Sequence, residues 1–307
     1  MDTIDLNRLH QMTHYRNPAV YGKELVTICV PAYNSAGTIG ETIGSLVRQT
    51  YQNIHIIVID NASTDNTVEI IKDFKDTRIF VVQHLQHLPY GELNWNRCFR
   101  HMHGKYSGIF HADDVYKPDM VAKQVEVMDT DSRIGGVFVQ AEVIDETGEV
   151  TSKPRAIPEY KDNILHGQDI LLATMNHGNT LFTSSALFRT SIIRGESFRF
   201  DMYRDAADMD LWMRIARKSG IAVIDEPLMQ YRVSSNNGTA NINRYRTKES
   251  ALYRVIDDYL PTYPDVPQSC IDRYELRRMH DKAICCTNFV KKTGKRIPGL
   301  LLWGLMK

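Results

Sequence analysis

Two adjacent carboxylates follow a short apolar segment in the first half of the chain, in the sequence His111-Ala112-Asp113-Asp114. Carboxylate oxygens at the end of a strand can fill one or two coordination sites on Mg²⁺ or Mn²⁺ while phosphate oxygens fill others. An Asp-Asp pair before a helix also occurs as a simple helix cap, so the motif alone leaves both roles open. The sequence therefore offers a candidate site for a divalent cation and a bound diphosphate.

Two motifs that commonly bind phosphates are absent from the sequence. No Gly-x-Gly-x-x-Gly follows the first apolar segment, and no Gly-x-x-x-x-Gly-Lys-Ser/Thr occurs anywhere. This excludes a dinucleotide fingerprint and a P-loop, so a diphosphate would depend on the cation. Polar residues also follow two other apolar segments, at Pro31-Ala32-Tyr33-Asn34 and Asp60-Asn61.

Apolar segments alternate with helical patterns from residue 25 onward, and these elements would position the polar residues. The patterns predict strands over 25–30, 54–60, 79–82 and 106–110, and helices over 38–47, 68–74, 93–103 and 118–128. Thr38 and Glu41 have capping-box spacing at the start of the first helix. Such alternation predicts right-handed βαβ units in a mostly parallel sheet, which binds ligands at the carboxyl ends of its strands.

The alternation loosens beyond about residue 135. Segments 137–139 and 143–144 are predicted to form a hairpin with its turn at Gly148, and 221–224 and 229–233 to be strands around a helix over 210–218. From Asn243 onward helical patterns dominate.

Composition limits the class of protein. The chain has 307 residues, and 37 basic and 37 acidic side chains give no net charge, so no global field favours nucleic acid as a partner. Five cysteines without a Cys-x-x-Cys pair argue against a disulfide framework or structural zinc and for a reducing compartment. The first twenty residues lack the apolar centre of a signal peptide, and no apolar run is long enough to span a bilayer. We therefore expect a cytoplasmic protein.

Taken together, the polar segments resemble family 2 of the inverting GT-A glycosyltransferases. The matching segments cover roughly residues 25 to 235 in the family's order, and the ordered set is more specific than any one of them. They are Val30-Pro-Ala-Tyr-Asn34, Ser45-Leu-Val-Arg-Gln-Thr-Tyr51, Val58-Ile-Asp-Asn-Ala-Ser-Thr-Asp65, Asn96-Arg97, Gly104-Lys-Tyr106, His111-Ala-Asp-Asp-Val-Tyr-Lys-Pro-Asp119 and Asp208-Met-Asp-Leu-Trp-Met-Arg214. The resemblance implies a Rossmann-like GT-A α/β fold.

The resemblance also implies a nucleotide-sugar site at the strand ends. The turn from Pro31 to Tyr33 would pack on the base, and Asn61, where the family usually has a second Asp, would pair with the base edge. An oxygen of Asn61 can accept the N3–H of uracil or thymine, which is compatible with a UDP or dTDP donor, although Asn61 could instead only form a turn. The implied site comprises Pro31, Ala32, Tyr33, Asn34, Asp60, Asn61, Arg97, His111, Ala112, Asp113 and Arg232.

The metal ligands implied by the resemblance are Asp113, at the family's main metal-binding carboxylate, and Asp114, and the cation would be Mn²⁺ or Mg²⁺. His111 stands where the first Asp of an Asp-x-Asp motif is common. Its imidazole can hydrogen-bond to ribose or phosphate, or ligate Mn²⁺ better than Mg²⁺. The alternative is a strand-end residue that contacts no ligand.

Asp208 aligns with the family's general base, which takes the proton of an acceptor hydroxyl as that oxygen attacks the anomeric carbon. The family commonly has Glu just before this Asp, whereas here Ala207 precedes it and Asp205 could supply the missing charge. Asp208 could instead cap the helix over 210–218. Arg232 could neutralise phosphate charge or join an ion pair. In the family a His often follows this motif, whereas here the equivalent position is near Ser234.

The expected organisation is an N-terminal extension over 1–24, a GT-A domain over 25–240 and a helical C-terminal region over 241–307. The GT-A domain would divide into a nucleotide-binding half, 25–115, and an acceptor-binding half, 116–240. Four basic residues between 291 and 296 precede an apolar segment over 298–306. This tail is suited to lying on an anionic bilayer, so we expect peripheral contact with the cytoplasmic face of a membrane through 289–307. Packing of the same leucines on the protein's own core is the alternative.

The predicted function is sugar transfer from a nucleoside-diphosphate donor to a hydroxyl of a glycan or lipid-linked saccharide acceptor, in surface polysaccharide or glycan assembly. A sugar-phosphate nucleotidyltransferase would share the α/β core but should begin with a Gly-rich loop that contains Arg and Lys, and residues 31–34 are not one. A non-catalytic binding or scaffold relative is favoured by the departures at His111, Ala207 and Ser234. The presence of Asp60, Asp113 and Asp208 in their expected places argues against it.

Overall fold

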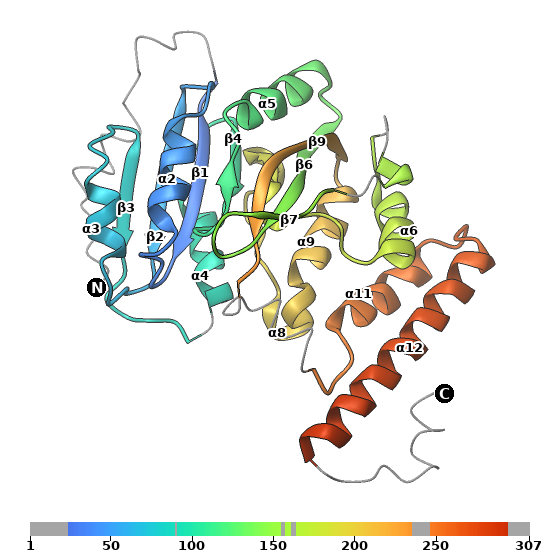
Figure 1. The fold of residues 1–307 in the computed structure, drawn as a ribbon. Helices are drawn as coiled ribbons and strands as arrows, with labels where there is room; N and C mark the ends of the chain where they lie inside the picture. The colour runs from blue at the N-terminus through green and yellow to red at the C-terminus, as the bar shows by residue number, and fades with distance from the viewer. Residues whose placement is uncertain (1–23, 90, 155–156, 161–163, 235–245, 294–307) are drawn as a thin grey trace. The chain divides into compact units, whose positions relative to one another are not determined.

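The structure of the protein is a computed structural model that describes residues 24–89, 91–154, 157–160, 164–234 and 246–293 (Figure 1). The chain divides into two compact units. The first comprises residues 1–165, 181–198 and 215–232, and the second comprises 166–180, 199–214 and 233–307.

A single mixed sheet forms the centre of the first unit, with the strand order β3-β2-β1-β4-β8-β6-β9-β5 in the described residues and β7 paired with β6. Strands β3, β2, β1 and β4 are mutually parallel. They comprise Ile79–Gln83, Ile54–Asp60, Val26–Ala32 and Tyr106–Ile109. Every residue of β1, β2 and β4 is buried, which explains the nearly continuous apolar sequences of β1 and β2.

Helices connect the parallel strands as the sequence predicts. Helix α2 (Ile39–Val47) follows β1, α3 (Thr67–Lys72) follows β2, and α4 (Gly91–Cys98) with the 3₁₀ turn Phe99–His101 follows β3. Helix α5 is Met120–Thr130. The predicted helix 93–103 is therefore shorter and ends in the 3₁₀ turn. Ile39, Ile43 and Leu46 of α2 are buried in the same core as Val26, Ile28 and Val30 of β1.

The sheet becomes mixed in its second half. Strand β6 (Ile134–Ile144) is one strand where two segments were expected, and it pairs antiparallel with β7 (Val150–Ser152) across the predicted turn at Gly148, which has a φ of 89°. Strand β9 (Gly220–Arg232) likewise joins the two predicted segments, because register shifts accommodate residues 225–227 without ending the pairing with β6. The short strands β8 (Leu187–Arg189) and β5 (Val115–Tyr116) pair antiparallel with their neighbours.

The remaining elements of the first unit are short, namely the 3₁₀ turns Pro158–Tyr160 and Thr183–Ser185 and helix α7 (Thr190–Ile193).

The second unit is helical, and the pattern after Asn243 predicts the helical character of its last part. Its main helices are α6 (Gly167–His177), α8 (Phe200–Tyr203), α9 (Ala207–Ala216, to Arg214 in this unit), α11 (Ala251–Tyr259) and α12 (Gln268–Thr293), with 3₁₀ turns at Arg204–Ala206 and Leu260–Thr262. Asp210 of α9 is fully buried and is compensated by Arg199, Arg214 and the Tyr259 hydroxyl. This buried charge cluster connects α9 to α11.

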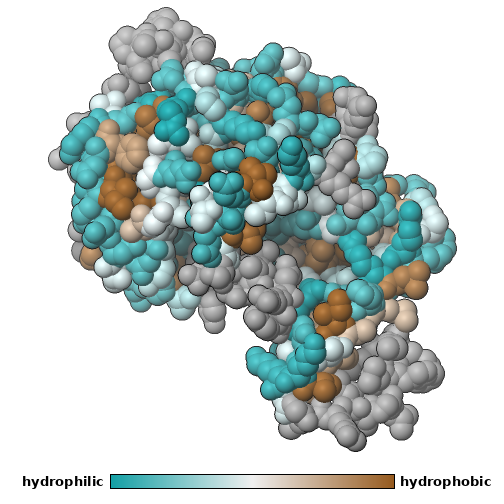
Figure 2. Space-filling view, viewed as in Figure 1, coloured by the Kyte–Doolittle hydropathy of each residue, from teal (hydrophilic) through white to brown (hydrophobic). Residues whose placement is uncertain are grey.

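Helix α12 exposes several apolar side chains, and Figure 2 shows hydrophobic surface along it. They are Leu276, Met279, Ile284 and Phe289. Among the described residues, no helix combines the length and the hydrophobicity needed to cross a membrane. The apolar segment 298–306 lies outside the described residues.

Candidate active site

The turn that contains His111, Asp113 and Asp114 follows β4, and side chains of α2 hold its backbone. The Thr38 hydroxyl donates to the Ala112 carbonyl at 2.9 Å, and the Thr42 hydroxyl donates to the Asp114 carbonyl at 2.8 Å. Thr38 is the N-cap of α2 but makes no side-chain capping hydrogen bond. The capping-box interpretation of Thr38 and Glu41 was therefore wrong, because the Thr38 hydroxyl is used to fix the turn.

Asp114 lies at the base of this turn with no exposed surface. One carboxylate oxygen accepts the Ser184 hydroxyl at 2.5 Å, and the other accepts the Arg232 backbone N–H at 2.9 Å. Burial, and then the neighbouring Asp113 carboxylate, raises the pKa of Asp114 well above its usual value. A nearby positive charge would stabilise the ionised form of this buried carboxylate, and a divalent cation would supply such a charge.

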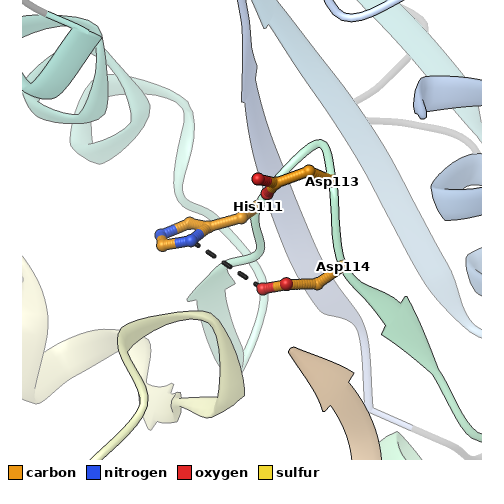
Figure 3. Close-up of side chains that lie close together, drawn as sticks. All are labelled: His111, Asp113 and Asp114. Atoms are coloured by element: carbon orange, nitrogen blue, oxygen red, sulfur yellow. Dashed lines mark ion pairs between the residues drawn. The ribbon is translucent and has the colours of Figure 1, made fainter. Parts of the chain in front are cut away.

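His111, Asp113 and Asp114 converge, as Figure 3 shows. One ligand atom from each lies within 4.8 Å of the others. His111 Nδ1 lies 3.8 Å from a carboxylate oxygen of Asp114. Burial lowers the pKa of His111, although the Asp113 carboxylate opposes that effect, and a neutral imidazole is the form that binds metals. These three residues can therefore offer one nitrogen and two oxygens to a cation.

Arg232 connects the turn to its surroundings. Its guanidinium donates to the backbone carbonyls of Asp113 at 2.9 Å and Asp145 at 3.0 Å, and it pairs with the Glu41 carboxylate. The ion pair that the sequence allowed as an alternative is thus present, and Arg232 holds the backbone of Asp113. The predicted contact of Arg232 with a donor phosphate stays a prediction.

The loops after β1 and β2 are hydrogen-bonded to each other. Asn34 has a φ of 47°, and its side-chain oxygen accepts the Thr64 N–H at 2.8 Å while its own N–H donates to the Ser63 hydroxyl at 2.9 Å. Pro31 and Ala32 pair with Ile59 and Asp60 in the β1–β2 register. Tyr33 is 41% exposed at the end of this strand, where its ring is accessible to a ligand.

Asn61 is fully buried, and its amide is already paired. Its oxygen accepts the Leu88 N–H at 2.9 Å and an Arg97 N–H at 2.8 Å, and its NH₂ donates to the Leu88 carbonyl at 3.0 Å. The His87 ring lies against Tyr33, with centroids 4.2 Å apart. The predicted base-binding residues Tyr33 and Asn61 therefore both contact the loop that follows β3.

Asp60, the last residue of β2, is 1% exposed. One carboxylate oxygen accepts the Ser63 N–H at 3.2 Å, and the other has no hydrogen-bond partner among the described residues. Strands β2, β1 and β4 are adjacent and parallel, so Asp60, Tyr33 and the 111–114 turn follow carboxyl ends at one edge of the sheet. The structure thus places the predicted donor-site residues of the first unit along that edge.

Asp208 belongs to the second unit and lies in the first turn of α9, after its first residue. It is partly buried, and its carboxylate accepts the Asn179 amide at 2.9 Å and the Met209 N–H at 2.7 Å. The alternative of an N-cap does not describe this position, because the helix already begins at Ala207. Asp205 accepts hydrogen bonds from Ser250 and Ala251 at the start of α11.

The sequence analysis missed several residues that shape the site. Ser184 donates to Asp114, Glu41 pairs with Arg232, His87 and Leu88 contact the predicted base-binding residues, and the ring of Trp95 lies against that of His111. Only Trp95 had a signal, since it directly precedes the Asn96-Arg97 motif.

Comparison with known proteins shows the family of this chain. Residues 27–195 match the family model described as glycosyl transferase family 2. A glycosyltransferase from Haemophilus influenzae, described as uncharacterized, is 30% identical over 234 residues, which cover 74% of this chain and 71% of the relative. The chain belongs to glycosyl transferase family 2. This membership confirms the resemblance found in the sequence and favours glycosyl transfer over nucleotidyl transfer.

A further relative is the Escherichia coli UDP-Glc:alpha-D-GlcNAc-diphosphoundecaprenol beta-1,3-glucosyltransferase WfaP. It is 28% identical over 76% of this chain and 87% of its own length. The Bacillus subtilis putative teichuronic acid biosynthesis glycosyltransferase TuaG is 25% identical, over 76% of this chain and 89% of its own length.

Solved structures show the same fold. S. aureus TarS (residues 1–349) in complex with UDP-GlcNAc matches with a TM-score of 0.58 and 16% identity, over 87% of this chain and 73% of that one. The mannosyltransferase PcManGT from Pyrobaculum calidifontis, in complex with GDP-Man and Mn²⁺, matches with a TM-score of 0.58 and 16% identity, over 97% and 85%. The GT-A fold predicted for this family 2 chain is confirmed.

Proposed function

We propose that this family 2 chain is a metal-dependent, inverting glycosyltransferase that moves a sugar from a UDP or dTDP donor to a hydroxyl of a glycan or lipid-linked saccharide, in polysaccharide assembly. The observation that supports this most is the convergence of His111, Asp113 and Asp114 at the carboxyl end of β4. The names of relatives add support, because WfaP uses UDP-Glc and TuaG is assigned to teichuronic acid biosynthesis.

The residues of the 111–114 turn fit a divalent cation. The Asp113 carboxylate accepts no hydrogen bond from the described residues, and the buried Asp114 carboxylate lies beside a neutral imidazole. We propose Asp113 and Asp114 as the carboxylate ligands of Mn²⁺ or Mg²⁺. When bound, the cation would act as a Lewis acid that stabilises the negative charge on the departing diphosphate.

The donor base would bind at the ends of β1 and β2. The buried Asp60 oxygen without a partner can accept the N3–H of uracil or thymine, and Tyr33 can pack on the ring. Asn61 can read the base only if its hydrogen bonds to Leu88 change, because its oxygen already accepts two. We propose Pro31, Ala32, Asn34, Arg97 and Ala112 as the further members of this donor site, and Arg232 as the residue that holds the Asp113 backbone beside it.

We propose Asp208 as the general base. Its carboxylate would take the proton of the acceptor hydroxyl while that oxygen forms a bond to the anomeric carbon. The bond from this carbon to the diphosphate breaks on the opposite face, and the nucleoside diphosphate leaves with the bonding electrons. The anomeric configuration is therefore inverted. Asn179 supports the assignment, because its amide orients the carboxylate without neutralising it.

We propose residues 25–240 as the catalytic domain, with 25–115 binding the nucleotide and 116–240 the acceptor. We also propose that residues 289–307 contact a membrane, since an acceptor linked to a diphosphoprenol, as in the name of WfaP, is confined to one. Exposed apolar residues on α12 and the basic Lys291 and Lys292 near its end agree with such contact. A chain truncated after Asn288 should stay folded, still hydrolyse the donor and no longer bind anionic liposomes. Equal liposome binding by both chains would contradict the membrane proposal.

A panel of UDP-, dTDP- and GDP-sugars tests the enzyme proposal. The wild-type protein should release nucleoside diphosphate from a UDP- or dTDP-sugar with Mn²⁺ or Mg²⁺, and not after chelation. Asp113→Ala should lose this release. Asp119→Ala changes an exposed Asp at the N-cap of α5, serves as the matched control and should keep it. Full activity after chelation would contradict the metal assignment. Absence of release from every donor would favour the non-catalytic alternative.

A further inference from the structure

His111 occupies the position where the family commonly has an Asp, and its side chain is largely buried. Nδ1 faces the Asp114 carboxylate at 3.8 Å, a separation too long for a hydrogen bond (Figure 3). Nε2 is also buried and has no hydrogen-bond partner among the described residues. Neither ring nitrogen is therefore used by a hydrogen bond in this part of the structure.

The ring of His111 is held in place by Trp95. Their centroids are 4.6 Å apart with an interplanar angle of 30°. Helix α4, which includes Trp95, is itself anchored at the site edge, because Asn94 donates to the Ile59 carbonyl at 2.8 Å and Arg97 donates to Asn61. This ring contact with an anchored helix restricts the movement of the His111 side chain, whose Nδ1 is directed at Asp114, and a metal-binding histidine needs such support.

We propose that His111 binds the cation of this site through Nδ1 and thereby gives the enzyme a preference for Mn²⁺ over Mg²⁺. The inference rests on the proposed function, which places a divalent cation at Asp113 and Asp114. Mg²⁺ strongly prefers oxygen ligands, whereas imidazole nitrogen suits later first-row metals, and Mn²⁺ accepts it more readily than Mg²⁺ does.

The charge of the residue at position 111 also favours Mn²⁺ over Mg²⁺. An Asp at position 111 would give the site a third carboxylate, whereas the neutral imidazole leaves two. Loss of one negative charge weakens binding of a hard cation that depends on electrostatic attraction to oxygen. With Nδ1 on the cation, Nε2 bears the ring proton. No described residue accepts that proton.

The coordination can be tested on the wild-type chain without any substitution. Pulsed electron paramagnetic resonance of the Mn²⁺-loaded protein, with UDP present, should show ¹⁴N coupling from a directly bound imidazole. The same measurement on His111→Asp should lack this coupling. Bound Mn²⁺ without ¹⁴N coupling in the wild-type protein would overturn the inference, even if every variant of His111 failed to fold.

The metal preference is tested by titration with Mn²⁺ and by its competition with Mg²⁺. His111→Asp should lower the ratio of Mn²⁺ to Mg²⁺ affinity by about tenfold, because an oxygen replaces the nitrogen ligand. His280→Asp, on the exposed surface of α12, makes the same change in residue type and should leave the ratio unchanged. An unchanged ratio in folded His111→Asp would overturn the inference while leaving the metal requirement intact. A wild-type protein that binds neither cation would contradict the proposed metal dependence itself, and this inference with it.

Discussion

Substitution of Arg232 can test whether this residue beside the 111–114 turn stabilises the fold or binds the donor. Its side chain is 5% exposed, and its guanidinium donates to the carbonyls of Asp113 and Asp145 and pairs with Glu41. Arg232→Met keeps most of the apolar stem and removes all of these donors. The substitution should therefore destabilise the turn that contains Asp113.

The size of the effect follows from the contacts. Each hydrogen bond from a charged donor contributes about 1.5–3 kcal/mol, so the two carbonyl contacts together contribute about 3–6 kcal/mol. The Glu41 carboxylate is 53% exposed, and such a pair adds at most about 1 kcal/mol. We expect Arg232→Met to lower the free energy of unfolding by about 4 kcal/mol. Glu41→Gln should lower it by no more than about 1 kcal/mol.

Urea-induced unfolding followed by tryptophan fluorescence measures both variants, and calorimetry with UDP measures donor binding. If Arg232 stabilises the turn that contains Asp113, Arg232→Met should lose much stability and Glu41→Gln should lose little. If Arg232→Met is as stable as the wild-type protein but no longer binds UDP, the reasoning is refuted. Arg232 would then act on the donor phosphates, as the sequence resemblance implied.

Three further predictions concern the base, the nucleotide and pH. Asp208→Asn should lower kcat by about 10²–10⁴-fold with unchanged donor affinity, because an Asn oxygen can still accept the Asn179 amide; a near-normal kcat would place the base elsewhere. His87→Ala should bind UDP about 2–10-fold more tightly in calorimetry, since the ring pair with Tyr33 no longer has to separate, whereas weaker binding would mean that His87 contacts the base. Burial, and then His103, lowers the pKa of the 3% exposed His55 to about 4, so the unfolded chain binds more protons between about pH 6.5 and 4. The free energy of unfolding should fall by about 3 kcal/mol as pH falls through this window, and an equal fall in His55→Gln would exclude His55 as the cause.

The sequence predicted the parallel half of the sheet well because strands β1, β2 and β4 are buried on both faces. Strands β1 and β2 have continuous apolar sequences that end in turn residues, so both their location and their carboxyl ends could be inferred. In the second half, two strands over 221–224 and 229–233 were expected, whereas the structure has the single strand β9, which contains Asp225 and Pro227 between them. The strand continues because a bulge in its pairing with β6 takes up the extra residues, and such pairing depends on a partner distant in sequence.

Prediction of the candidate site is limited in the same way, because its contacts also join residues that are distant in the sequence. Asp113 and Asp114 could be found from their position after a predicted strand, but Ser184 and Arg232, which bind Asp114, are 70 and 118 residues away in the chain. Thr38 shows that capping-box spacing can be present although its hydroxyl makes a different hydrogen bond. Its spacing to Glu41 correctly predicted the start of a helix, yet its hydroxyl donates to Ala112 across the fold. Only tertiary contacts reveal that difference.

The most direct test of inverting sugar transfer is ¹H NMR of the products formed from an α-linked UDP- or dTDP-sugar. With Mn²⁺ present, the account predicts that the sugar first appears with the β configuration, at the rate at which nucleoside diphosphate is released, and that chelation stops both. Initial formation of the α configuration would contradict inversion by direct displacement. Release that continues unchanged after chelation would contradict the role of the cation at Asp113 and Asp114.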